Sequence, residues 1–152
     1  MALTNFIEGH IVKYAHQVGL INSTCNKTEY SIQLFDGNEI NSNPTELEGI
    51  SLSKEILEIL GFKHYCDTIY TPRFLLECKK SETVYDYPQL SLDCYDGKMV
   101  ATVFCHKIGS SRDKNIHHFI YHLHELQEIY RNYGYTIPLS MQMLYEIQRS
   151  IQ

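Results

Sequence analysis

One stretch in the last third of the chain constrains the fold more than any other part. Between residues 115 and 133, apolar side chains recur at spacings of three and four residues: Ile116, Phe119, Ile120, Leu123, Leu126 and Tyr130. This spacing places apolar side chains along one side of an α-helix. Asn115 or Asp113 offers an N-cap, and Gly134 offers a C-terminal stop. The pattern therefore predicts one long amphipathic helix over residues 115–133.

The first 45 residues predict β-structure. Residues 28–35 alternate between polar and apolar side chains, which is typical of a half-buried strand. Residues 9–14 and 18–21 are further candidate strands, and residues 22–27 read as a polar turn. Asp36-Gly37 is a hairpin signal. We expect a bent antiparallel sheet or a small barrel here.

The middle of the chain predicts a short helix and a second sheet. Ser53 is a candidate N-cap, Leu52 and Leu57 occupy hydrophobic-staple positions, and Gly61 suits the left-handed residue after the helix. Candidate strands cover residues 64–70, 73–79, 90–95 and 99–106, with a turn at Asp96-Gly97. A last helix is expected over residues 138–151. The predicted fold class is α+β, in a single domain over residues 1–152 with subregions 1–45 and 46–152.

Composition excludes some functions and indicates a compartment. A net charge of −5 argues against general binding to nucleic-acid backbones, which needs a concentrated positive field. The five cysteines are odd in number and form no CxxC pair, so buried free thiols are favoured over disulfides. No segment approaches the roughly 18 apolar residues of a membrane span. We expect a cytoplasmic protein that does not span a membrane.

The histidines between residues 115 and 133 are the first candidate site. On the predicted helix, His118, His122 and Glu125 project from one flank at metal-ligand spacing. A metal site on this flank is a minor alternative, because the pattern lacks the HExxH signature. The favoured interpretation is that each histidine either makes hydrogen bonds within the protein or lies on the surface. We therefore assign no metal and no cofactor.

A second set of residues offers contacts for a flat, charged ligand. Tyr121 and Tyr85 can stack on a base, and Gln127 can tie the helix to a strand or bind a ligand. The remaining candidates, which can contact phosphate or ribose, are Arg112, Lys114, His117 and His124. For Arg112 and Lys114 a solvated loop is the alternative, and for Gln127 a structural hydrogen bond.

Two blocks of the sequence resemble a family of small proteins that phages and mobile elements of gut bacteria encode. Residues 47–62 are similar to the family pattern I-P-L-T-x-x-W-L-x-x-x-G-F, and residues 123–130 are similar to V-H-x-L-Q-N-L-Y. The chain departs from these patterns at Ile56, where the family has Trp, and at Glu128, where it has Asn. The resemblance implies an accessory protein inside a bacterial host cell.

Three functions follow as hypotheses. The chain has no GxSxG elbow, P-loop or GxGxxG motif, so we expect a protein that is not an enzyme. The resemblance leads us to expect an anti-defence protein that sequesters a nucleotide immune signal, as a homo-oligomer. The first alternative is an inhibitor or adaptor that binds a host protein. The second is a metal-dependent hydrolase using His118, His122 and Glu125.

Overall fold

The computed structural model describes residues 6–26, 28–67, 72–75, 89–95, 98–105, 116–132 and 134–152. The chain divides into two compact units, and we describe each by itself. Unit 1 comprises Met1–Ile50 together with Pro138–Gln152, and unit 2 comprises Ser51–Ile137. Strands and helices occur in both units, so the predicted α+β class is confirmed. The last helix belongs to unit 1 and therefore joins the N-terminal strands.

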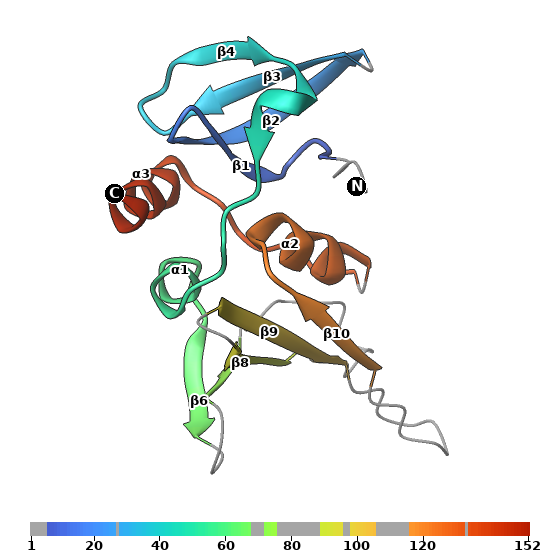
Figure 1. Cartoon of the computed structure of the whole chain (residues 1–152), viewed down its shortest axis with the longest axis vertical. Helices are drawn as coiled ribbons and strands as arrows, with labels where there is room; N and C mark the ends of the chain where they lie inside the picture. Colours follow the sequence, from blue (N-terminus) through green and yellow to red (C-terminus); the bar gives the residue numbers. More distant parts are fainter. Residues whose placement is uncertain are drawn as a thin grey trace. The chain divides into compact units, whose positions relative to one another are not determined.

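Unit 1 contains a five-stranded antiparallel sheet in the order β4-β3-β2-β1-β5 (Figure 1). Its strands are β1 (Ile11–Tyr14), β2 (Gln17–Asn26), β3 (Glu29–Leu34), β4 (Glu39–Ser42) and β5 (Leu47–Glu48), with a 3-10 turn at Pro44–Glu46 before β5. Strands β4 and β5 are the two edges, and no ladder joins them in the described residues. The sheet is therefore open, and the small-barrel alternative was wrong.

The alternation predicted for residues 28–35 sets the buried face of this sheet. Ile32 and Leu34 are buried, whereas Gln33 between them is only partly covered. Side chains two residues apart leave a strand on the same face, so such alternation buries one face. The apolar cluster of this unit consists of Phe6, Val12, Ile21, Ile32, Leu34 and Leu47, with Tyr14, Tyr30 and Ile40 packed against it.

The predicted hairpin at Asp36-Gly37 is confirmed. Gly37 has φ +92° and donates its backbone N–H to the carbonyl of Leu34 at 2.9 Å, while Asp36 Oδ1 accepts from the N–H of Asn38 at 3.0 Å. The polar turn predicted for residues 22–27 was wrong in position. Strand β2 runs on to Asn26, with register shifts after Ile21 and Thr24. Polar side chains do not end a strand whose backbone is still paired.

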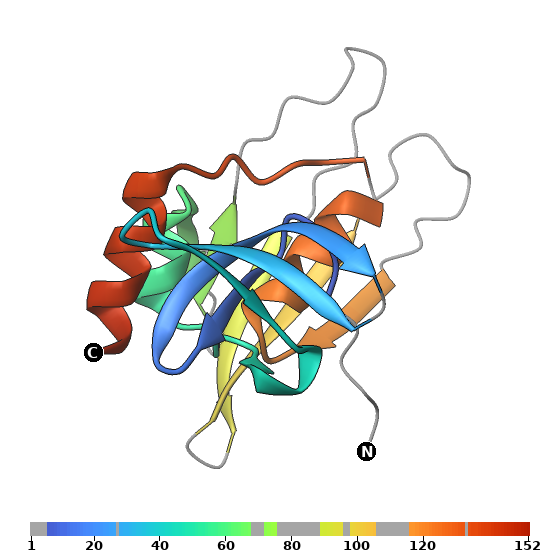
Figure 2. The ribbon, with the colours of Figure 1, turned by 90° about the horizontal axis from the view of Figure 1, so that it is seen from above.

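A last helix, α3 (Met141–Ile151), completes unit 1 and lies beside β2 (Figure 2). The prediction of a helix over 138–151 is confirmed, except that it begins three residues later. Ser140 is the N-cap, because its hydroxyl accepts the N–H of Met143 at 3.2 Å. Leu144 and Ile147 form its buried side.

Unit 2 contains a second antiparallel sheet in the order β10-β9-β8-β7-β6. Its strands are β6 (Lys63–Asp67), β7 (Pro72–Leu75), β8 (Gln89–Tyr95), β9 (Lys98–Cys105) and β10 (Ile116–Ile120). The first four overlap the four predicted strands, of which residues 68–70, 76–79 and 106 lie outside the described part. Tyr95 pairs with Lys98, as a turn at Asp96-Gly97 requires, although these two residues lie outside the described part. Strand β10 was not predicted.

The short helix α1 (Lys54–Ile59) follows its predicted signals closely. The hydroxyl of Ser53 accepts the N–H of Ile56 at 3.1 Å, and Leu52 and Leu57 are both buried. After the helix, Gly61 has φ +95° and donates to the carbonyl of Glu58 at 3.1 Å. Phe62 then donates to the carbonyl of Leu57 at 2.9 Å, which completes a Schellman motif.

The long helix predicted over residues 115–133 was wrong in its first half. Residues Ile116–Ile120 form β10, which pairs with β9 from Ile116 opposite Cys105 to Ile120 opposite Ala101. Only α2 (Leu123–Asn132) is helical. It ends as predicted at Gly134, which has φ +83°. Pairing with a neighbouring strand outweighed the helical spacing of the apolar residues.

Candidate functional site

The chain passes from strand to helix at a well-anchored point of unit 2, between β10 and α2. The carbonyl of Tyr121 accepts the N–H of Leu52 at 3.0 Å, and Ser51 and His122 form an antiparallel bridge. On the strand side, β10 is paired along its length with β9. Backbone hydrogen bonds hold the chain on both sides of this point, so the backbone from which its side chains project is fixed in position.

Four side chains at this point define what we call the β10–α2 junction: Phe119, Tyr121, His122 and Glu125. Phe119 is 69% exposed and Tyr121 is 48% exposed, whereas Ile120 between them is buried. Side chains alternate across extended backbone, so the two rings leave the chain on the side away from the core. Large exposed aromatic side chains on an ordered backbone mark a candidate contact surface.

His122 and Glu125 form the polar part of the junction. His122 Nδ1 lies 2.7 Å from Glu125 Oε1, and both side chains remain partly exposed. The carbonyl of His122 accepts the N–H of Leu126 at 3.3 Å, so His122 directly precedes the first turn of α2. An acidic residue in a first turn is favourable for the helix dipole. The pair therefore stabilises the start of α2 and also presents polar atoms to solvent.

His124 is buried at the start of α2. It is 4% exposed and is one of the buried residues of α2. Its ring stacks on that of His122, with centroids 5.5 Å apart and an interplanar angle of 23°. The buried imidazole of His124 therefore packs against the His122 ring and supports it. This burial favours a structural role for His124, and the contact with phosphate or ribose stays a prediction.

The other predicted ligand residues divide into described and undescribed positions. Gln127 is half-buried, one turn beyond the start of α2. His117 lies in β10 opposite Phe104, but its side chain is outside the described part. Tyr85, Arg112 and Lys114 also lie outside the described residues. Of the predicted set, the structure brings Tyr121 and His124 to the junction.

The helical basis of the metal alternative was wrong. His118 lies in β10 and His122 precedes α2, so the two histidines are not four residues apart on one helix. His122 and Glu125 of the proposed trio are in contact, at 2.7 Å. Among the described residues, no group of three His, Cys, Asp or Glu side chains is placed to hold a metal ion.

Phe119 is the site residue that the sequence patterns missed. The helical spacing assigned it to the core, but in strand β10 it falls on the exposed side. A signal was present: residues 116–121, Ile-His-His-Phe-Ile-Tyr, contain only residue types that rank low in helix propensity, and most of them favour strands.

Comparisons with models of known protein families, with curated proteins and with solved structures found no match to this chain. Within the described residues, no helix has the length and apolar content needed to cross a bilayer.

Proposed function

We propose that this chain is a non-enzymatic accessory protein of a phage or mobile element that binds and sequesters a nucleotide immune signal. The observation that carries the proposal is the half-exposed ring of Tyr121 on a hydrogen-bonded backbone. The resemblance to small phage-encoded proteins supplies the biological setting. The β10–α2 junction is the proposed contact surface.

Stacking is the main source of affinity in this proposal. An aromatic ring stacked on a base contributes about 1–3 kcal/mol and accepts any base. Phe119 and Tyr121 are two residues apart, and a strand rises roughly 6.5–7 Å over two residues. Stacked bases are about 3.4 Å apart. The backbone spacing between positions 119 and 121 is therefore about twice the thickness of a base, which leaves room for one planar base between rings at these positions.

The polar groups of the junction supply orientation. The carboxylate of Glu125 can accept hydrogen bonds from the amino group of a base or from a ribose hydroxyl. His122 lies 2.7 Å from that carboxylate and holds it in place. A carboxylate repels phosphate, so the phosphates of the ligand point away from Glu125. Arg112 and Lys114, the predicted anion contacts, remain part of the proposal for that end of the ligand.

The proposal is tested by incubating the purified protein with a panel of cyclic dinucleotides and ADP-ribose derivatives. Unbound material is removed, the protein is heat-denatured, and the released compounds are identified by mass spectrometry. Release of an intact nucleotide supports sequestration. If every nucleotide stays in the unbound fraction, or if one is degraded, the proposal is refuted.

Matched variants assign the binding to the junction. Tyr121→Ala is expected to raise the Kd of the retained nucleotide by about 5- to 150-fold, since each 1.4 kcal/mol is tenfold. Tyr145→Ala is the control. Tyr145 is 45% exposed on α3 of unit 1, so this substitution removes a similarly exposed ring away from the junction. Equal losses in both variants would contradict a site at the junction.

A second candidate function is favoured by one specific observation. Strand β10 is an edge of its sheet and carries Phe119, the most exposed large hydrophobic side chain described. Sheet edges and exposed aromatic rings both serve protein–protein contacts. In this alternative the chain binds a host protein, as an inhibitor or as an adaptor, or it forms a homo-oligomer through this edge. This alternative is tested with Phe119→Ser. It is established if the wild-type chain binds no nucleotide and the variant loses either one stoichiometric partner or the self-association seen by light scattering.

A further inference from the structure

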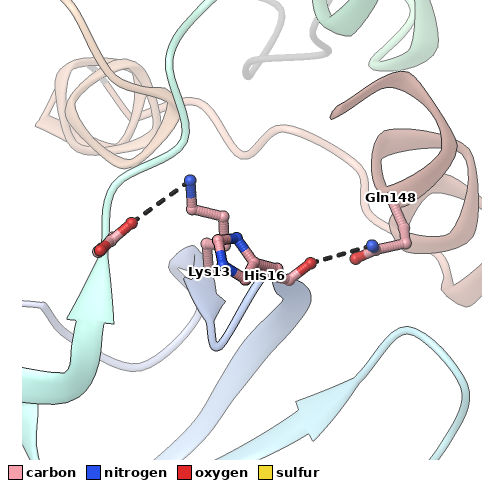
Figure 3. A network of polar contacts seen from close by, with 4 residues as sticks. Lys13, His16 and Gln148 are labelled. Atoms are coloured by element: carbon pink, nitrogen blue, oxygen red, sulfur yellow. Dashed lines mark hydrogen bonds and ion pairs between the residues drawn. The ribbon is translucent and has the colours of Figure 1, made fainter. Parts of the chain in front are cut away.

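A buried amide in α3 contacts the backbone of unit 1 across 130 positions of sequence. Gln148 is 4% exposed, and its Oε1 accepts the N–H of Val18 at 2.7 Å. Its Nε2 donates to the carbonyl of His16 at 3.0 Å (Figure 3). One side chain therefore satisfies a donor and an acceptor near the start of β2. In a β-ladder, the N–H and C=O of one residue in a neighbouring strand make such a pair of hydrogen bonds.

The position of this amide explains its use. Strand β3 pairs with β2 as far as Leu34 opposite Gly19, and Phe35 donates its N–H to the carbonyl of Val18 at 2.9 Å. The chain then turns away at Asp36, so no further residue of β3 is available beyond Val18. Gln148 continues the ladder from that point, and its amide takes the place of a missing strand residue.

The contact also supports an unusual turn. Strands β1 and β2 are joined by Ala15 and His16, which have φ +44° and +67°. Tight hairpin turns favour Gly and Asn at such positions, because a Cβ atom is strained there. The carbonyl that Gln148 holds belongs to His16, the second of these residues. The position of α3 and the shape of this turn are therefore coupled through one side chain.

Apolar packing alone does not fix where α3 sits. Leu144 and Ile147 are buried, but burial of apolar surface is non-directional. Gln148 adds two directed hydrogen bonds, one to Val18 in β2 and one to His16 in the turn before it. The ion pair Lys13–Glu48, at 3.3 Å, joins β1 to β5 and leaves α3 aside. Gln148 thus supplies the directional contact.

We propose that α3 is a strap that closes over the end of β2, with Gln148 as its latch, and that it opens as a unit while the sheet stays folded. Opening releases the N–H of Val18 and the carbonyl of His16, and it relaxes the left-handed turn. This device lies in unit 1 and is independent of the β10–α2 junction.

The test is residue-resolved hydrogen exchange measured by NMR on the full chain. In Gln148→Met, which keeps the length of the side chain but removes both polar groups, the N–H of Val18 is expected to exchange at least about fivefold faster. The N–H of Phe35, held by the Val18 carbonyl, is the internal reference and is expected to keep its rate. Unchanged exchange at Val18, or equal acceleration at Val18 and Phe35, would overturn the proposal.

A second variant makes the latch depend on pH. Gln148→Glu introduces a carboxyl group that, when protonated, can accept from Val18 and donate to His16, as the amide does. When ionised it cannot donate, and it repels the His16 carbonyl. Burial raises the pKa of the introduced carboxyl above its ordinary value of about 4.3. The variant is therefore closed like wild type below about pH 4 and opens as pH rises through the raised pKa.

The readout is again the exchange rate of Val18 divided by that of wild type at the same pH. We expect a ratio near one in acid and at least about fivefold at neutral pH. A ratio that is the same at both pH values, whether high or near one, would show that hydrogen bonding by residue 148 does not control α3.

Discussion

Gly19 in β2 is expected to tolerate no larger side chain. A Cβ atom built on Gly19 would lie 2.6 Å from Cγ2 of Ile32, 3.1 Å from the carbonyl oxygen of Gln33 and 3.3 Å from Cδ2 of Leu34. Two of these neighbours cannot easily move. Ile32 is fully buried in the cluster of unit 1, and the Gln33 oxygen belongs to the backbone of β3. Gly19→Ala therefore forces a shift in the pairing of β2 with β3.

The expected cost follows from two opposing effects. Inserting a methyl group into a packed core costs about 1–3 kcal/mol. Against this, Ala in a strand is roughly 0.5–1 kcal/mol better than Gly, because the unfolded chain loses less entropy. The midpoints of these two ranges leave a net destabilisation of about 1 kcal/mol. It is measured as a lower free energy of unfolding in urea at unchanged slope.

Two variants separate the contact from general effects of replacing glycine. Gly9→Ala meets nothing within 4 Å but has φ +91°, so any cost there is conformational and not steric. Ile32→Leu removes the γ2 methyl at similar volume. Combined with Gly19→Ala, it is expected to destabilise less than the sum of the two single changes. A Gly19→Ala protein as stable as wild type, or strict additivity in the double variant, would refute the reasoning.

Two further predictions concern the helix ends of unit 2. Ser53→Ala removes the hydroxyl that accepts the N–H of Ile56 at 3.1 Å. It is expected to lower the free energy of unfolding by about 1 kcal/mol, measured by thermal or urea unfolding. Ser51→Ala is the control and is expected to be near neutral, because Ser51 keeps its backbone bridge to His122. Gly134→Ala places a Cβ at φ +83° and is expected to cost roughly 1–2 kcal/mol, whereas Gly134→Asn costs less because Asn adopts this conformation more readily. Equal stability of Ala and Asn at position 134 would count against the left-handed cap.

The elements predicted best are those whose signals are local. Ser53 and Gly61 bracket α1, and Asp36-Gly37 marks a hairpin, because a cap or a turn is made by residues within a few positions of one another. The hairpin at Ala15 and His16 carries no such signal. Part of its support comes from Gln148, 132 positions after His16. No pattern within a short window could reveal that contact.

The error at residues 115–133 has a physical explanation that also bears on the site. The apolar side chains at 116, 119, 120 and 123 fit a helix by spacing, but Ile120 is buried and Phe119 exposed, which is the alternation of a strand. Helix-favouring residues begin only at Leu123, where α2 begins. Had residues 116–120 been helical, Phe119 would have faced the core and His118 and His122 would have shared a flank. Because they are a strand, the histidines separate and Phe119 joins Tyr121 on the surface. The change of secondary structure at His122 thus removes the basis for a metal site and creates the aromatic surface on which the proposed function depends.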